Sequence, residues 1–246
     1  MIVFEHPSAL PAAVVAVGFA LLARLMRAVT DGGALVGAVI AFLLMSACGL
    51  AGFLPLLAVF LLTWLATRWR ADRKASIGVA EHRGGRRASQ VLANLGAAGL
   101  CAWAAAAFSD QNAILLAAGM AALAEAAADT VSSEIGQGTG STPRLIVGLA
   151  AVPPGTNGAI SLEGTLAGCI AASVVAWVAA FSNIIPLRWT PLIAFAGVLG
   201  MIFDSVLGAL FENRDRMGND SVNFVSTIFA ADLSLLALVA LRALRW

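Results

Sequence analysis

Long apolar segments without charge alternate with short polar ones along most of the chain. A helix needs about 20 apolar residues to cross a bilayer, and most of the segments approach or exceed that length. The strict alternation of a membrane β-barrel is missing from them. The pattern therefore predicts an all-α fold, a polytopic bundle of transmembrane helices. The apolar segments are residues 7–23, 32–67, 88–109, 111–124, 164–187 and 189–203.

The segment 32–67 is too long for a single ordinary crossing. It is interrupted at residues 49–55, Gly-Leu-Ala-Gly-Phe-Leu-Pro, and glycine and proline are the residues that most often break a helix. We expect a helical hairpin of two short spans here. The whole chain then has about eight spans, with seven as the alternative.

Composition supports a membrane protein and gives no sign of a second domain. Hydrophobic residues make up 60% of the chain and charged residues 12%, about half of the charged fraction of an average soluble domain. No large soluble domain is expected, so we interpret residues 1–246 as one integral membrane domain with polar loops near 68–90, 136–160 and 213–220. The net charge of +1 gives no reason to expect nucleic acid as a partner.

The loop 68–90 carries the densest group of basic residues. By the positive-inside rule this loop faces the cytoplasm. Counting spans outward from it places the other two polar loops on the same side and leaves only Arg188, Arg242 and Arg245 on the opposite side. We therefore expect a bacterial-type inner-membrane protein whose polar chemistry faces the cytoplasm.

Acidic residues occur in the segment 124–136, AEAAADTVSSEIG, directly after an apolar run. Asp129 and Glu125 are four residues apart and so share a helix face, with Ser132 or Ser133 one turn further on. An ionised side chain within a bilayer is costly unless it is compensated, and such groups usually mark functional sites. Glu134 points to another side of the helix, where it either reaches the membrane interface or pairs with an arginine of the basic loop. Asp129 is therefore the main catalytic candidate, with Glu134 as a second.

A second acidic stretch ends another predicted span. Asp204, Gly208 and Glu212 follow one another at intervals of four residues, so they are expected on one helix face. Gly208 leaves room there for a close helix or a ligand. Asp204 is a further catalytic candidate because it lies in mid-span, where helix capping does not explain an acid.

Polar residues also begin the last predicted helix, at Asn219, Asp220 and Asn223. Helix capping explains Asn219 or Asp220, but not both. Mg²⁺ prefers oxygen ligands and commonly takes one or two carboxylates together with substrate phosphates. Acids at two neighbouring span ends therefore predict a Mg²⁺ site. Its candidate ligands are Asp129, Asp204, Glu134 and Asp220.

Three further groups of residues suit phosphate. Residues 155–158, Gly-Thr-Asn-Gly, form a predicted turn with exposed backbone N–H groups before a helix that begins at Ser161, although a plain loop after two prolines would look similar. Arginine suits phosphate oxygens. Gln90 and Asn94 enter a predicted span on one face, where they either join helices or contact a base or a phosphate. The binding candidates are Arg83, Arg86, Arg87, Gln90, Asn94, Ser133, Arg144, Gly155, Thr156, Asn157, Gly158, Asn219 and Asn223.

Five segments in a fixed order form a specific motif set. They are GVAEHRGGRRASQVLANLG at 78–96, AAADTVSSEIG at 126–136, PPGTNGAISLEGTLAG at 153–168, FDSVLGAL at 203–210 and NDSVNF at 219–224. They resemble an integral-membrane family of otherwise unknown function that includes the plant phytyl-phosphate kinase of vitamin E synthesis. The resemblance covers nearly the whole chain. One departure is Val131-Ser132, where the family often has Trp-Ala.

The resemblance implies phosphoryl transfer to a prenyl monophosphate, giving a prenyl diphosphate. It also implies a nucleoside triphosphate donor, CTP or ATP, with CTP favoured because related membrane kinases of phytol and dolichol use it. We therefore expect a Mg²⁺-dependent membrane kinase of phytyl or geranylgeranyl monophosphate. Two alternatives stay open: a CTP-dependent lipid cytidylyltransferase, and a transporter or lipid carrier without enzymatic activity. Polar groups clustered at one membrane face favour an enzyme, and the sequence leaves the oligomeric state open.

Overall fold

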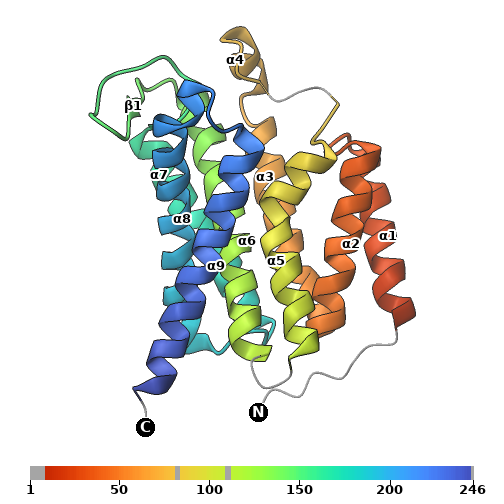
Figure 1. Cartoon of the computed structure of the whole chain (residues 1–246). Helices are drawn as coiled ribbons and strands as arrows, with labels where there is room; N and C mark the ends of the chain where they lie inside the picture. The colour runs from red at the N-terminus through yellow and green to blue at the C-terminus, as the bar shows by residue number, and fades with distance from the viewer. Residues whose placement is uncertain (1–8, 81–83, 109–111, 245–246) are drawn as a thin grey trace.

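A computed structural model describes residues 9–80, 84–108 and 112–244. Within these ranges the chain is helical, apart from short turns and one two-stranded hairpin (Figure 1). The helices are α1 (Ala9–Leu25), α2 (Asp31–Cys48), α3 (Phe53–Arg68), α4 (Ala71–Ser76), α5 (Ala88–Ala107), α6 (Asn112–Thr139), α7 (Leu162–Phe181), α8 (Thr190–Leu210) and α9 (Asn219–Ala243). Three short 3-10 turns are η1 (Leu50–Gly52), η3 (Leu187–Trp189) and η4 (Glu212–Arg214).

Seven of the described helices are long and apolar enough to cross a membrane. The count agrees with the alternative of seven spans, and the eighth predicted span corresponds to α1, which is apolar but only 17 residues long. The only strands among the described residues are β1 (Arg144–Leu145) and β2 (Ala159–Ile160), which pair antiparallel. The predicted all-α transmembrane bundle without a large soluble domain is confirmed.

The predicted hairpin within residues 32–67 is also confirmed. Helix α2 ends at Cys48, and Gly49 follows with a left-handed φ of +73°, a conformation that favours glycine. Helix α3 begins at Phe53 and carries Pro55 in its first turn, where a missing N–H costs no helical hydrogen bond. The break therefore follows from the local chemistry of the glycine and the proline.

Helix α6 lies at the centre of the bundle and packs against α5, α7, α8 and α9 (Figure 1). Every residue from 116 to 128 is buried. Small residues allow this close packing. A Cβ on Gly168 of α7 would lie 2.9 Å from the Ala128 carbonyl oxygen of α6, and a Cβ on Gly197 of α8 would lie 2.8 Å from Ala124 Cβ. The central helix thus brings its acids to the inside of the bundle.

The polar connections gather at one end of the bundle, which we call the loop end (Figure 1). It contains α4, the β1–β2 hairpin and η4, while the apolar residues of the helices form the core away from it. The loop end is therefore the place where side chains of α5, α6, α8 and α9 can meet polar ligands.

Candidate functional site

A cavity of about 410 Å³ opens at the loop end, between α5, α6, α7, α8 and α9. Its size is within the range of small-molecule sites. The structure brings most of the predicted site residues to its wall, although they come from distant parts of the sequence. Those residues are Arg86, Gln90, Asn94, Asp129, Ser133, Glu134, Gly155, Thr156, Asn157, Gly158, Asp204, Asn219 and Asn223.

Three predicted residues within the described ranges do not line this cavity. Arg87 is exposed, and so is Arg144, whose Nη1 donates to the Leu149 carbonyl at 2.8 Å. Asp220 lies in the first turn of α9 but makes no capping hydrogen bond. Arg83 lies outside the described residues. The cavity therefore carries a narrower set of charged groups than the sequence suggested.

Two carboxylates line the cavity, Asp129 of α6 and Asp204 of α8, which we call the floor acids. Their side chains influence each other electrostatically. Asp129 lies where the fully buried stretch of α6 ends, and both acids line the cavity. Ser226 of α9 donates from Oγ to Asp204 Oδ2 at 3.0 Å and is itself completely buried. Sequence reasoning missed Ser226, whose only signal is its position about one turn after Asn223.

Glu125 lies one turn below Asp129 and does not line the cavity. Its side chain is 1% exposed, and Oε1 has no hydrogen-bond partner among the described residues. Gly200 of α8 makes the space for it, because a Cβ on Gly200 would lie 2.5 Å from Glu125 Cγ. Glu125 is thus a third carboxyl group behind the floor acids, with which it interacts electrostatically.

The floor acids suit one type of metal site. No group of three or more His, Cys, Asp or Glu side chains among the described residues is arranged to hold a metal ion alone. Mg²⁺, however, is commonly held by one or two carboxylates, several waters and substrate phosphates. Asp129 and Asp204 fit that donor set, while Asp220 lies off the cavity wall.

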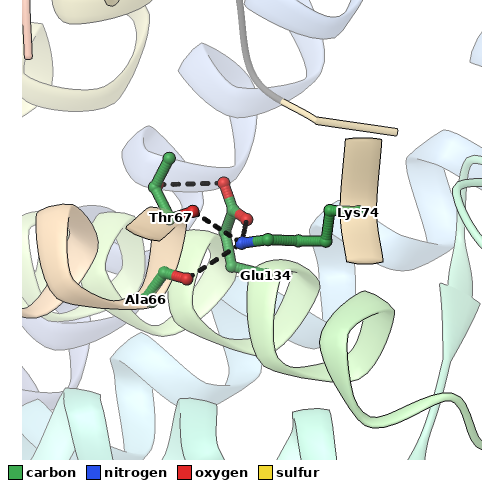
Figure 2. A network of polar contacts seen from close by, with 4 residues as sticks. All are labelled: Ala66, Thr67, Lys74 and Glu134. Carbon is green, nitrogen blue, oxygen red and sulfur yellow. Dashed lines mark hydrogen bonds and ion pairs between the residues drawn. The ribbon is translucent and has the colours of Figure 1, made fainter. Parts of the chain in front are cut away.

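Glu134 is engaged with the end of α3 and with α4, as Figure 2 shows. Lys74 Nζ forms an ion pair with Glu134 Oε2 and donates to the carbonyls of Ala66 at 3.0 Å and Thr67 at 2.7 Å. Thr67 Oγ1 donates to Glu134 Oε1 at 2.9 Å. Lys74 is 1% exposed, so this contact is a buried clamp that joins three helices. The partner of Glu134 in the basic loop is therefore Lys74, and not an arginine as predicted.

Arg86 is fixed at the cavity wall through its backbone. Its N–H donates to the Ala28 carbonyl at 2.9 Å, and its own carbonyl accepts from the Thr30 N–H at 3.0 Å. Gly85 permits this contact with a φ of +80°, since a Cβ there would lie 2.6 Å from the Val29 nitrogen. The guanidinium interacts electrostatically with Asp129. The Gly-Gly-Arg-Arg motif therefore holds one cationic side chain at the edge of the acidic floor.

Gln90 and Asn94 line the cavity but also serve helix α5 itself. Gln90 Oε1 accepts from the Arg87 N–H at 2.8 Å, which caps the start of the helix. Asn94 Nδ2 donates to the Gln90 carbonyl at 2.9 Å. Capping explains part of the Gln90 signal, and the Asn94 Oδ1 atom is the more available acceptor at this wall.

The turn at residues 155–158 lies directly on α8. A Cβ on Gly158 would lie 2.4 Å from the Ser205 carbonyl oxygen, and Gly158 has a φ of +72°. The space at Gly208 is filled by this turn, not by another helix. Ser161 caps α7 by accepting from the Gly164 N–H at 3.1 Å, so the predicted helix start is confirmed. The turn and the α7 N-terminus both face the cavity, where backbone N–H groups favour anions.

One prediction about the acidic stretch of α8 is wrong. Glu212 does not share a helix face with Asp204, because α8 ends at Leu210 and Glu212 lies in η4. The chain reverses here with Asp215 in a left-handed conformation, φ +55°. Glu212 still lines the cavity from the turn.

The family model described as "Integral membrane protein DUF92" matches residues 14–231. The chain belongs to this family. Its match includes the elements that build the polar cavity, from Arg86 on the α5 side to Asn223 of α9. No solved structure matches the chain.

Three relatives with wide sequence coverage come from a plant, a cyanobacterium and an archaeon. "Protein VTE6, chloroplastic" of Arabidopsis thaliana is 34% identical over 200 residues, covering 77% of this chain and 59% of the plant protein. "Uncharacterized membrane protein sll0875" of Synechocystis sp. is 32% identical over 200 residues, covering 80% of this chain and 78% of the relative. "Uncharacterized membrane protein MJ0933" of Methanocaldococcus jannaschii is 31% identical over 220 residues, covering 88% and 89%. The chain thus spans less than two thirds of the plant protein.

Proposed function

We propose that this DUF92 protein is a Mg²⁺-dependent prenyl-phosphate kinase, which transfers a phosphoryl group from a nucleoside triphosphate to a prenyl monophosphate. The observation that carries the proposal is that Asp129, Asp204 and Arg86 line one polar cavity at the end of an apolar bundle. A phosphorylated lipid has the same division into a charged head and an apolar chain. The motif resemblance to the family of the phytyl-phosphate kinase supports phytyl or geranylgeranyl monophosphate as the acceptor and CTP as the donor.

The cavity residues have different roles in phosphoryl transfer. A phosphate oxygen of the acceptor attacks the γ-phosphorus of the donor, and the bond from that phosphorus to the β-phosphate oxygen breaks to release the nucleoside diphosphate. Arg86 and the N–H groups at 155–158 bind phosphate oxygens, while Asp129 and Asp204 would hold Mg²⁺. Bound Mg²⁺ would neutralise charge on the phosphates.

No strong general base is needed in this reaction, because the acceptor phosphate is already anionic at neutral pH. The contribution of the protein is to position two anions that repel each other and to offset their charge. This suits a site without histidine in the described residues of its wall. The basic residues of the 68–90 loop place the loop end on the cytoplasmic side in our proposal, in a bacterial-type inner membrane, where nucleotide is available.

A transfer assay with labelled nucleotide tests the proposal. Purified protein in detergent is incubated with Mg²⁺, a panel of prenyl monophosphates and either γ-labelled or α-labelled CTP or ATP. A kinase moves the γ-label onto the lipid and leaves the α-label on the nucleotide. A cytidylyltransferase moves the α-label and releases pyrophosphate. Lipid movement across proteoliposomes without nucleotide, with no label transferred, would instead support a transporter.

A further inference from the structure

A second cavity, of about 450 Å³, lies between α1, α2, α3 and α5. Its wall is largely apolar, in contrast to the first cavity, and includes Phe19, Leu56, Val59, Phe60, Val91 and Leu95. Gly33 and Gly37 of α2 widen it, because they carry no side chain. The space is therefore suited to a hydrocarbon chain and lies within the apolar part of the bundle.

The two cavities meet at one set of residues. Arg86, Gln90 and Asn94 line both of them. A molecule that places an anionic group at Arg86 can therefore extend its apolar part between α1 and α3 without leaving the protein. A bulk phospholipid would meet the acidic floor with its headgroup, whereas a monophosphate presents a small anion to Arg86.

Two aromatic rings that contact each other line the second cavity, Phe19 and Phe60. Phe19 of α1 contacts Phe60 of α3 edge to face, with ring centroids 4.9 Å apart. Phe53 supports Phe19 from the other side, again at 4.9 Å. Phe60 lies two helical turns before Arg68 at the loop end of α3, so the Phe19–Phe60 pair lies deeper in the bundle. A prenyl chain that enters beside Arg86 and extends along α3 therefore meets this pair.

We propose that the second cavity binds the prenyl chain of the acceptor and that the Phe19–Phe60 pair limits the length of chain that is accepted. This assignment rests on the proposed kinase function for the identity of the acceptor. The prenyl chain contributes to the binding free energy because its apolar surface is buried. The cavity measures the length of the prenyl chain from the fixed position of the phosphate at Arg86. Longer chains bind better only until they reach the aromatic pair.

A matched pair of glycine variants tests this assignment. Gly37→Leu fills the cavity, and no protein atom lies within 4 Å of its new Cβ, so the backbone is not forced to move. Gly18→Leu is the control, because Gly18 also has no atom within 4 Å of its Cβ but is exposed and lies outside the cavity. Phe60→Ala is the opposite change, which opens the deep end.

The assay compares geranyl, farnesyl and geranylgeranyl monophosphates as acceptors. Gly37→Leu should lower kcat/KM for geranylgeranyl monophosphate about tenfold and leave geranyl monophosphate nearly unchanged, as expected from lost burial of about two methylene groups. Gly18→Leu should keep the wild-type preference. Phe60→Ala should shift the preference toward longer chains. The proposal is overturned if either Gly37→Leu or Phe60→Ala keeps the wild-type preference.

Thermal stabilisation of the protein by each monophosphate, without nucleotide, separates this assignment from the kinase proposal. If the wild type transfers phosphate but Gly37→Leu keeps the wild-type chain-length profile, the kinase function stands and the cavity assignment fails. If no lipid is phosphorylated but stabilisation grows with chain length and this dependence is lost in Gly37→Leu, the cavity assignment stands and the kinase function fails. Equal stabilisation by all chain lengths contradicts the cavity assignment.

Discussion

Loss of the buried lysine clamp should destabilise the protein without changing the floor acids, Asp129 and Asp204. In Lys74→Met, the Glu134 carboxylate keeps the hydrogen bond from Thr67 but loses the ion pair with the lysine. The carbonyls of Ala66 and Thr67 each lose the hydrogen bond that Lys74 Nζ donates to them. The side chains of Lys74 and Glu134 are only 1% and 11% exposed, so water screens the pair weakly. Breaking such a buried pair costs about 3–5 kcal/mol.

The lower end of that range, about 3 kcal/mol, corresponds to a fall in Tm of about 6–12 °C for a protein of this size. The measurement is thermal unfolding of the purified protein in detergent, followed by intrinsic tryptophan fluorescence. Arg73→Met is the control, because the neighbouring Arg73 is exposed on the same short helix and its loss should change stability by less than about 0.5 kcal/mol.

The double variant Lys74→Met, Glu134→Gln should recover much of the loss, because no unpaired charge then remains buried. At temperatures below its Tm, Glu134→Gln alone should keep substantial activity if Glu134 serves the clamp. An unchanged Tm in Lys74→Met would refute the reasoning. If Glu134→Gln lost activity at unchanged stability, Glu134 would again be a candidate metal ligand.

Four further substitutions test the geometry of the cavity. Gly33→Ala places a Cβ 2.5 Å from the Arg86 carbonyl oxygen, so it should raise the KM for the lipid about tenfold, measured by label transfer. Asp204→Asn should lower kcat at least about a hundredfold with little loss of Tm, whereas Ser226→Ala, which removes only the hydrogen bond to that carboxylate, should lower kcat about tenfold. Gly158→Ala should lower stability by about 1–3 kcal/mol and raise the KM for nucleotide, because its φ of +72° and the nearby α8 backbone do not tolerate a side chain. Wild-type kinetics in any of these variants would contradict the role given to that residue.

Much of the fold could be predicted from the chain because each signal is local. Apolar length predicts the spans, and the glycines and proline at 49–55 predict the hairpin break. The acids of α6 and α8 could be assigned to one site because a charge within a bilayer needs a group that compensates it. By the same reasoning, the motif segments could be expected to line one cavity.

The remaining features depend on contacts between distant segments. Lys74 looks like one more basic loop residue in the sequence, and only the return of α4 onto α6 buries it beside Glu134. Ser226 gains its importance from the approach of α9 to Asp204. Glu212 was misplaced because the helical period was extended past Leu210, where the chain turns. Periodicity describes the face of one helix, not the neighbour that it meets.

The most direct test of the central claim is transfer of the γ-label from CTP or ATP to geranylgeranyl or phytyl monophosphate by purified wild-type protein and by Asp129→Asn, at matched thermal stability. The account predicts a labelled prenyl diphosphate that requires added Mg²⁺, and at least about a hundredfold less of it with Asp129→Asn. Equal transfer by the two proteins, or no labelled lipid from the wild type with any acceptor of the panel, would contradict it.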